Sequence, residues 1–396
     1  MIDSLTTSVC VDDVQQTEPV NWLDDWKMSR IDSRIVRTLP SCLGRFVIHR
    51  PHKVLLFPAE KEMLATNLRS LASGDAAAAI VPAEIEFVCC EPCDAQRDLD
   101  STIRWYSMQT VLVLGATGLL GHQVMRILTP RFQVIGTTQR TEVCPSAFLI
   151  RDPEALRYRI SADHPEGVRR LIQHERPDVV INCIGIVKSQ FNRVPHRVAE
   201  FINGEFPLQL ADMCDQAGSR LIHISTDCVY SGAHGNYSES DLPDPIDVYG
   251  RTKLQGEPNA ASNLTLRTSF IGMECETANG LVAWLLSQRG GQVRGYTRAI
   301  FSGLTTIVLA RLLGDLIEQH PELRGIWHVS ADPIDKHHLL CFVNEALGLE
   351  ITIAPDDSVV CDRSLNSSAF RALTGYQPPS WPAMVAEMAA DAKSYP

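Results

Sequence analysis

The stretch that most constrains how this chain can fold is Thr110–Gly121, an apolar run followed by three evenly spaced glycines. Its first part, Val111–Leu114, reads as a fully buried strand. The glycines are Gly115, Gly118 and Gly121, and a helical pattern follows them. A strand, a glycine turn and a helix in this order predict a nucleotide site. The alternative interpretation is a glycine-rich turn of an ordinary α/β protein.

The glycine turn also predicts which residues contact the nucleotide. The first glycine permits a tight turn, the second lets the backbone approach a pyrophosphate, and the third lets the helix pack close to the strand. The helix then points its amino end at the phosphates. The predicted contacts from this stretch are Gly115, Thr117, Gly118, Leu119, Leu120 and Gly121.

Apolar strands alternate with helical patterns from Met108 onward. This order indicates a doubly wound parallel sheet of the Rossmann type. After Gly272 the alternation loosens, which predicts a smaller carboxyl-terminal α/β lobe that binds substrate. The predicted domains are 108–272 for the nucleotide and 273–396 for the substrate. Expected strands include Val134–Thr137, Phe148–Ile150, Asp178–Ile184, Leu221–Ser225, Leu264–Thr268, Ile326–Val329 and Ile351–Ala354; expected helices include Arg197–Ala217, Leu281–Gln288, Thr305–Gln319 and His338–Leu347.

Residues 1–107 form an unassigned amino-terminal extension. They are either an appended domain or an upstream extension of the reading frame that is not normally made. Their cysteine cluster, Cys89, Cys90 and Cys93, lacks a second Cys-x-x-Cys or paired histidines nearby. A zinc site needs four ligands at workable spacing, so these are expected to be ordinary thiols and no metal is predicted.

Composition excludes several classes of function. The 396 residues carry a net charge of −11, which gives no electrostatic footprint for nucleic acid and no attraction to anionic lipid. The sequence contains no run of 18 or more apolar residues, so no transmembrane helix is predicted. The amino terminus lacks the pattern of a secretory signal, so the 12 cysteines are expected to be reduced. A cytoplasmic protein is therefore expected.

The end of the second strand bears on the choice of cofactor. NAD binding favours a carboxylate at this point, but the strand ends Thr137-Thr138-Gln139-Arg140. A guanidinium matches the geometry of a 2′-phosphate, so Arg140 favours NADPH, with NADH as the alternative. The plainer interpretation is a solvated surface arginine.

The next buried strand ends at Asn182, followed by Cys183 and Ile184. The carboxyl ends of parallel strands face the nucleotide crevice, so these three residues are predicted to line the cofactor site. A buried asparagine also needs hydrogen-bond partners, and a structural role remains open.

Thr226 and the pair Tyr249 and Lys253 form the strongest chemical constellation. Lys253 lies four positions after Tyr249, so the two share one helix face. An ammonium near a phenol lowers the pKa of the tyrosine and suits it to proton transfer. Thr226 stands at a strand end and can offer a hydroxyl to the same substrate oxygen. Tyr-x-x-x-Lys alone occurs by chance in many helices.

These motifs together resemble the extended short-chain dehydrogenase/reductases, and most closely the dTDP-4-dehydrorhamnose reductases. The likeness runs from about Met108 to the carboxyl end. The motifs that carry it are Gly-Ala-Thr-Gly-Leu-Leu-Gly, Arg-Pro-Asp-Val-Val-Ile-Asn, Ile-Ser-Thr-Asp-Cys-Val-Tyr-Ser-Gly, Val-Tyr-Gly-Arg-Thr-Lys-Leu-Gln-Gly-Glu and Leu-Arg-Thr-Ser.

The resemblance implies a reductase that passes hydride from NADPH to the 4-keto carbon of a nucleotide-linked 6-deoxyhexose. It implies Tyr249 as proton donor, Thr226 as a hydrogen bond to the keto oxygen, and Lys253 as the residue that holds the nicotinamide ribose. The chain departs from the family at Phe270, where tryptophan is usual, and at Ile300–Leu304. These departures fall on the sugar side, so UDP or GDP sugars remain open beside dTDP-4-dehydrorhamnose.

Other members of the superfamily provide the alternatives. Dehydratases carry a glutamate where this chain has Cys228, which disfavours dehydration. A nucleotide-sugar epimerase can use the same tyrosine and lysine. A regulatory subunit that binds a protein partner, as the β subunit of methionine adenosyltransferase does, is the alternative from a different class. The expected ligand is a nucleotide sugar, and a homodimer is one assembly that the resemblance allows.

Overall fold

The computed structural model describes residues 108–142, 153–191, 193–258, 261–275 and 279–395, together with three short strands nearer the amino terminus. Those strands are β1 (Phe46–Ile48), β2 (Lys53–Leu56) and β3 (Glu86–Cys89). β2 pairs antiparallel with β1 and parallel with β3. The chain divides into two compact units, 1–107 and 108–396. The predicted strand at 148–150 lies outside the described residues, as do two cysteines of the cluster, at 90 and 93.

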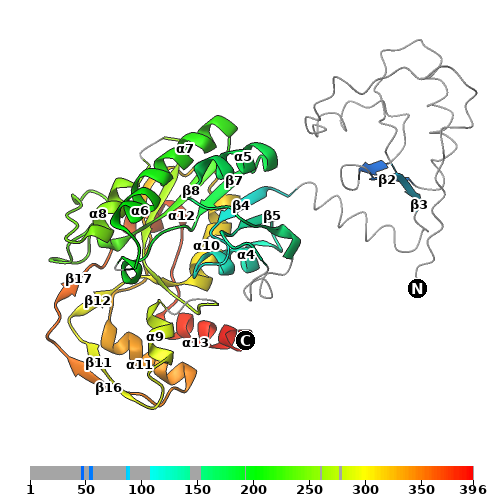
Figure 1. Ribbon diagram of the computed structural model, residues 1–396. Helices are drawn as coiled ribbons and strands as arrows, with labels where there is room; N and C mark the ends of the chain where they lie inside the picture. Colours follow the sequence, from blue (N-terminus) through cyan, green and yellow to red (C-terminus); the bar gives the residue numbers. More distant parts are fainter. Residues whose placement is uncertain are drawn as a thin grey trace, which may run out of the picture. The chain divides into compact units, whose positions relative to one another are not determined.

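The second unit is organised around a seven-stranded parallel sheet with the order β6-β5-β4-β7-β8-β9-β14 (Figure 1). The chain enters at β4, builds outward to β6, and then crosses back to β7. The sheet is therefore doubly wound, as the alternation of strands and helices predicted. Its strands are β4 (Thr110–Leu114), β5 (Gln133–Thr137), β6 (Leu156–Arg157), β7 (Val179–Asn182), β8 (Arg220–Thr226), β9 (Leu264–Thr268) and β14 (Gly325–His328).

Both faces of this sheet are buried. Successive side chains of a strand point to opposite sides, so each strand contributes to two hydrophobic cores. In β4, Val111 and Val113 belong to one hydrophobic core, whereas Leu112 and Leu114 belong to the other. Helices α4 (Gly121–Leu128) and α10 (Thr306–Gln319) cover the first face. Helices α5 (Pro165–Glu175) and α7 (Phe206–Ala217) cover the second, and α8 (Val248–Gln255) follows β8.

The helix predicted over Arg197–Ala217 is interrupted by a wide turn. It consists of α6 (His196–Glu200), a π-helical turn (Phe201–Glu205) and α7. Pro207 explains the interruption, because proline has no N–H to donate to the residue four positions earlier. The turn lies against α8, where a Cβ added to Gly256 would stand 1.9 Å from the Asn203 carbonyl oxygen.

The predicted division at residue 272 needs a correction for two elements. The strand expected at 326–329 within the lobe is β14, which pairs with β9 in the large sheet. Helix α10 likewise packs on the sheet, beside α4. β14 is short and only partly buried, so its pattern alone does not reveal its partner.

The remaining carboxyl-terminal elements form small sheets and helices beside the large sheet. β11 pairs with β16, β12 lies between β15 and β17, and β10 pairs with β13. The strands are β10 (Phe270–Ile271), β11 (Gln292–Tyr296), β12 (Ala299–Phe301), β13 (Leu304–Thr305), β15 (Ile334–Asp335), β16 (Thr352–Asp356) and β17 (Cys361–Asp362). The helices are α9 (Leu281–Leu286), α11 (Lys336–Leu347), α12 (Ser368–Thr374) and α13 (Trp381–Ala392).

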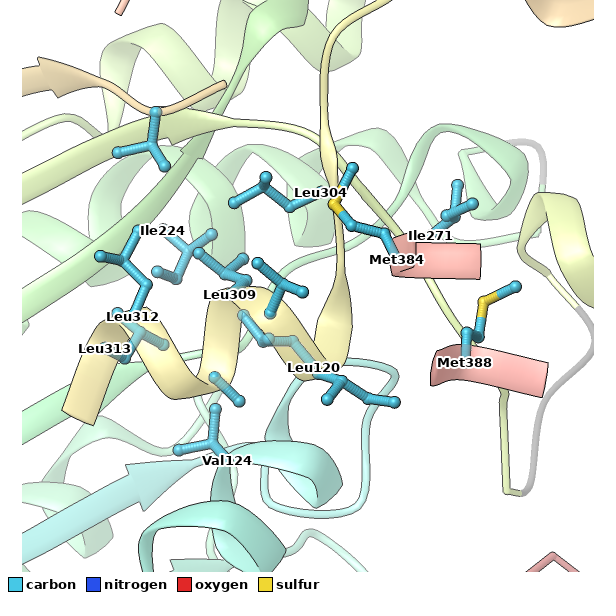
Figure 2. Close-up of a cluster of buried hydrophobic side chains, with 14 of the residues drawn as sticks. Leu120, Val124, Ile224, Ile271, Leu304, Leu309, Leu312, Leu313, Met384 and Met388 are labelled. Carbon is cyan, nitrogen blue, oxygen red and sulfur yellow. The ribbon is translucent and has the colours of Figure 1, made fainter. Parts of the chain in front are cut away.

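The carboxyl-terminal elements close over the helix that follows the glycine turn. Figure 2 shows Leu309 and Leu313 of α10 in one hydrophobic cluster with Val124 of α4, and Met384 of α13 near Leu304. Polar contacts join the same parts: Asp391 accepts hydrogen bonds from Gln123 at 2.6 Å and from Arg126 at 2.9 Å. His122 is buried and its Nε2 lies 2.5 Å from the Tyr395 hydroxyl. The last residues described thus hold α4 in place.

Candidate functional site

The glycine turn has the tight geometry that its spacing predicted. Gly115 follows β4 directly and has φ +79°, in the left-handed region that favours glycine. The Ala116 N–H donates to the Thr137 carbonyl at 2.8 Å, which joins the turn to β5. A Cβ on Gly121 would lie 2.1 Å from the Gly115 carbonyl oxygen. Only glycine allows α4 to start this close to the strand.

The end of β5 lies beside this turn. Thr138 and Thr117 place their hydroxyl oxygens 3.3 Å apart, and the Gly115 N–H donates to the Thr137 hydroxyl at 3.2 Å. Arg140 is exposed two residues beyond Thr138, and its backbone N–H donates to the Thr138 hydroxyl at 3.3 Å. The arginine therefore stands next to the turn; its contact with a 2′-phosphate stays a prediction.

A pocket opens where β7 and β8 end, next to the first turn of α4. This is the edge at which doubly wound sheets bind ligands. Six of the predicted site residues line it: Leu120, Asn182, Cys183, Ile184, Tyr249 and Lys253. The other lining residues are Gly185, Ile186, Val187, Ile224, Ser225 and Phe270.

The sequence had not singled out Gly185, Ile186, Val187 and Ile224 as site residues. A usable signal existed for the first three, since they directly follow a buried strand that ends in a polar residue. The predicted residues that do not line the pocket are Gly115, Thr117, Gly118, Leu119, Gly121, Arg140 and Thr226.

The pocket loop, defined as residues 183–187, is held by one side chain of the π-helical turn. The Ile186 N–H donates to Asn203 Oδ1 at 2.8 Å, and Asn203 Nδ2 donates to the Ile186 carbonyl at 3.0 Å. The carboxamide thus satisfies the loop as a neighbouring strand would. Asn203 is buried and also lies 3.4 Å from the Thr252 hydroxyl of α8.

Tyr249 and Lys253 face the pocket from α8. Asp247 caps the start of this helix: its carboxylate accepts from the Gly250 N–H at 2.8 Å and pairs with Lys188 at 2.7 Å. Burial raises the pKa of the Tyr249 phenol, while a hydrogen bond with Thr226 opposes the shift. The prediction that a neighbouring ammonium lowers this pKa is therefore wrong for the structure as it stands, because burial dominates.

Lys253 is buried and makes a different set of contacts. Its Nζ donates to the Ile224 carbonyl at 2.8 Å and lies 3.5 Å from His223 Nε2. Burial lowers the pKa of the Lys253 ammonium to about 8, with Glu257 acting in the opposite direction. The other ring nitrogen of His223 lies 3.1 Å from Asn182 Nδ2. Asn182 therefore has the structural role that was left open, and it also lines the pocket.

Thr226 stands at the end of β8 with its hydroxyl already engaged. Its Oγ1 donates to Asp227 Oδ1 at 3.1 Å and accepts from the Cys228 N–H at 3.1 Å. Burial raises the pKa of Asp227 and raises that of the Cys228 thiol to about 12. The thiol is therefore protonated and unreactive at neutral pH.

A buried ion pair lies behind the pocket. Arg267 of β9 and Glu257 are paired at 2.7 Å, with side chains only 6% and 3% exposed. The Ser225 hydroxyl donates to Glu257 at 2.5 Å, and Arg267 donates to the Tyr230 hydroxyl at 2.8 Å. Tyr230 in turn contacts His328 of β14 at 3.1 Å. This cluster ties α8 to β8, β9 and β14.

One group outside the pocket has the composition of a metal site. Asp335, His337 and His338 place one ligand atom each within 4.8 Å of one another. Asp335 caps α11 through the His338 N–H at 3.0 Å, and His338 Nδ1 lies 2.6 Å from the same carboxylate. The arrangement is accounted for as a helix cap.

Among the described residues, no helix combines the length and apolarity that crossing a bilayer requires.

The comparisons with known proteins agree with this geometry. A family model described as RmlD substrate binding domain matches residues 108–394. A probable low-salt glycan biosynthesis reductase Agl14 of Haloferax volcanii is 34% identical over 190 residues, covering 44% of this chain and 59% of that protein. The dTDP-4-dehydrorhamnose reductase of Escherichia coli (strain K12) is 30% identical over 167 residues, covering 41% and 51%. The chain spans about half the length of that reductase.

A further curated protein and a solved structure are also similar to this chain. Methionine adenosyltransferase 2 subunit beta of Danio rerio is 29% identical over 255 residues, covering 60% of this chain and 74% of that protein. The crystal structure of a hypothetical dTDP-4-dehydrorhamnose reductase from Sulfolobus tokodaii is 26% identical with a TM-score of 0.58, covering 69% of this chain and 98% of that one. Because the family model covers most of the chain, the protein belongs to the RmlD substrate binding domain family of extended short-chain dehydrogenase/reductases.

Proposed function

We propose that this protein uses NADPH to reduce the 4-keto group of a nucleotide-linked 6-deoxyhexose. The observation that carries the proposal is that Tyr249 and Lys253 line one pocket with Asn182 and Phe270, beside the glycine turn. A proton donor, a cation and a nucleotide turn then meet at one edge of the sheet. Such a combination suits hydride transfer to a carbonyl.

The glycine turn fits a dinucleotide. The turn leaves Gly118 exposed, and within the described residues no hydrogen bond occupies the N–H groups of Leu119 and Leu120. Donors at a helix start bind phosphate well. Arg140 is exposed just after the end of β5, and a guanidinium there suits a 2′-phosphate, which supports NADPH. A dTDP-4-dehydrorhamnose reductase from Bacillus anthracis was crystallised with NADP and WbmG of Bordetella bronchiseptica with NAD, so NADH stays the alternative.

A reduced nicotinamide, when bound, supplies the hydride. The raised pKa of Tyr249 keeps its hydroxyl protonated at neutral pH, which is the form that gives a proton to the carbonyl oxygen. Burial lowers the pKa of Lys253 only to about 8, so its ammonium is still mostly charged at pH 7. That charge stabilises the phenolate left behind. The Thr226 hydroxyl lowers the pKa of Tyr249 against the effect of burial, so we assign it to the strand side of the phenol.

The apolar wall of the pocket consists of Leu120, Ile184, Ile186, Val187 and Phe270. It offers the flat nicotinamide ring a dry surface beside the proton donor. The sugar side of the family pattern differs in this chain, so the substrate is proposed at the level of a 4-keto-6-deoxy nucleotide sugar, with the dTDP form first. A homodimer stays a prediction.

The deciding experiment follows NADPH oxidation by the full chain with dTDP-, UDP- and GDP-linked 4-keto-6-deoxyhexoses. We expect turnover of at least one sugar and a reduced product in the mass spectrum. An isomerised product without net NADPH oxidation would identify an epimerase and overturn the proposal.

Replacing Tyr249 with phenylalanine tests the role of the hydroxyl. Tyr249→Phe should lower kcat by about 10²–10⁴-fold, because a positioned general acid contributes about that much. NADPH affinity, followed by fluorescence titration, should change little. The matched control is Tyr376→Phe, which removes a buried hydroxyl that has no hydrogen-bond partner among the described residues and does not line the pocket. A Tyr249→Phe variant that loses NADPH binding as steeply as turnover would contradict the assignment.

A regulatory subunit is the second candidate, and one observation favours it. The alignment with methionine adenosyltransferase 2 subunit beta covers 74% of that protein, whereas that with the E. coli reductase covers 51%. This candidate predicts tight NADPH binding without turnover of any sugar in the panel.

A further inference from the structure

His223 is a buried polar residue that the proposed reaction does not yet use. It lies in the middle of β8 with no solvent-exposed surface. In register it stands between Asn182 of β7 and Thr265 of β9. Buried polar side chains need partners, and both ring nitrogens of His223 face another side chain. One of those side chains is Lys253.

The hydrogen bonds of Asn182 indicate which nitrogen of the His223 ring carries the proton. The Ile184 N–H donates to Asn182 Oδ1 at 3.1 Å, which fixes the orientation of the carboxamide. Asn182 Nδ2 therefore faces His223 Nδ1 at 3.1 Å and donates to it. Since Nδ1 accepts, the neutral ring must carry its hydrogen on Nε2.

The imidazole is neutral in this setting. Burial and the nearby Lys253 both lower the pKa of His223 well below its ordinary value. Its Nε2–H points at Lys253 Nζ, 3.5 Å away. An ammonium has only donors, so it gains nothing from this N–H, whereas the free amine has a lone pair that can accept it.

The other groups around Lys253 do not supply this effect. Tyr249 lies one turn away on α8, and Glu257, which follows the end of that helix, is already paired with Arg267 at 2.7 Å. Asp227, after β8, acts on Tyr249 and is itself held by the Thr226 hydroxyl. From β8 the Ile224 carbonyl, 2.8 Å from Nζ, favours the ammonium. His223 is the neighbour that faces Nζ with a neutral donor.

We propose that His223 is a positioning residue for Lys253: its Nε2–H, aimed by Asn182 at the Nζ that the Ile224 carbonyl holds, makes the ammonium easier to deprotonate. The inference rests on the proposed function for its catalytic meaning, but not for its chemistry. A chain of three side chains, Asn182, His223 and Lys253, then runs from the pocket loop across β7 and β8 to α8. Through this chain, His223 of β8 influences whether Lys253, the cation on the same helix as Tyr249, is protonated.

The first test is the pH profile of kcat/KM for NADPH-dependent reduction by the full chain. In the wild type, activity should fall on the alkaline side as Lys253 loses its proton. His223→Leu removes the opposing N–H, so this alkaline limb should move upward by about one pH unit, the equivalent of one neutral hydrogen bond. His223→Gln, whose carboxamide can accept from Asn182 and still present an N–H, should keep the wild-type limb.

Thr265→Val is the matched control, because Thr265 pairs with His223 in register and its buried hydroxyl has no hydrogen-bond partner in the part of the chain that the structure describes. It should leave the limb in place. If His223→Leu lowers stability and activity without moving the limb, His223 is merely structural and the proposal is overturned.

The second test does not need turnover. Lysine side chains are labelled with ¹³C at Cε in the full chain, and the Lys253 signal is assigned from its loss in Lys253→Met. Its titration midpoint should be higher in His223→Leu than in the wild type or His223→Gln. An unchanged midpoint would overturn the inference. A shifted midpoint in a chain that reduces no sugar would retain it and reject the proposed function instead.

Discussion

The two sides of the pocket are held in place by different means. The glycine turn depends on backbone contacts, such as the close approach of Gly121 to the Gly115 carbonyl. The Tyr249 side depends on buried polar side chains, among them the Glu257–Arg267 pair and Asn203. The two sides should therefore respond differently to substitution. A substitution in the turn should destabilise it by a steric clash, whereas a substitution on the Tyr249 side should destabilise it by leaving a buried charge or polar atom without its partner.

Breaking the buried ion pair should have the largest effect. Arg267→Ala leaves Glu257 buried without its cation, which should lower the free energy of unfolding by about 3–5 kcal/mol. Urea denaturation measures the change. The control is Arg131→Ala, which removes surface pairs with Glu318 and Asp315, whose side chains are 43% and 40% exposed, and should change stability by about 1 kcal/mol or less. Equal losses in the two variants would contradict the proposed contrast.

The second prediction uses pH to separate the two sides. Folding lowers the pKa of Lys253 from 10.5 to about 8, so between these values the unfolded chain binds more protons. The contribution of Lys253 to stability should therefore rise with pH across this window. Relative to Lys253→Met, the wild type should gain up to about 3 kcal/mol between pH 8 and 10.5.

Urea titrations of both chains at several pH values measure this gain. Subtracting the variant removes the contribution of tyrosines that ionise in the same range. A difference that stays flat with pH would show that Lys253 is not held as the structure indicates.

The third prediction compares two glycines. Gly121→Ala should destabilise by about 1–3 kcal/mol and weaken NADPH binding, because a Cβ there would lie 2.1 Å from a backbone oxygen. Gly167→Ala in α5, where no described neighbour lies within 4 Å of an added Cβ, should instead stabilise by about 0.5–1 kcal/mol. Thermal unfolding and NADPH titration check both. A Gly121→Ala chain that binds NADPH normally would remove the steric argument.

The sequence predicted the glycine-turn side well because its signals are local. The strand at Val111–Leu114, the three glycines and the end of the next strand at Thr137 are neighbours along the chain or share a simple pattern. The spacing of Tyr249 and Lys253 is equally local, and the pocket brings both residues together.

What the sequence did not predict depends on partners far along the chain. His223 reads as an ordinary core residue until β7 and α8 place Asn182 and Lys253 beside it. β14 carries too little pattern to reveal that it pairs with β9, and Arg267 meets Glu257 only once α8 has docked. These contacts follow from packing, which local periodicity does not encode.

Asn203 has a consequence for the chemical lifetime of the protein. It is followed by Gly204, and glycine offers no side chain to hinder attack of its backbone nitrogen on the preceding carboxamide. That attack releases ammonia and closes a cyclic imide, which water then opens to leave an acid. In the folded chain the carboxamide is buried and bonded at both ends to Ile186. A chain held unfolded loses that protection. Deamidation would then turn a carboxylate oxygen toward the Ile186 carbonyl, so a refolded sample should show the acid at 203 in peptide maps together with weaker NADPH binding. The fraction of deamidated chains in an unfolded preparation would therefore increase with time, and the loop that Asn203 holds would be altered in those chains after refolding.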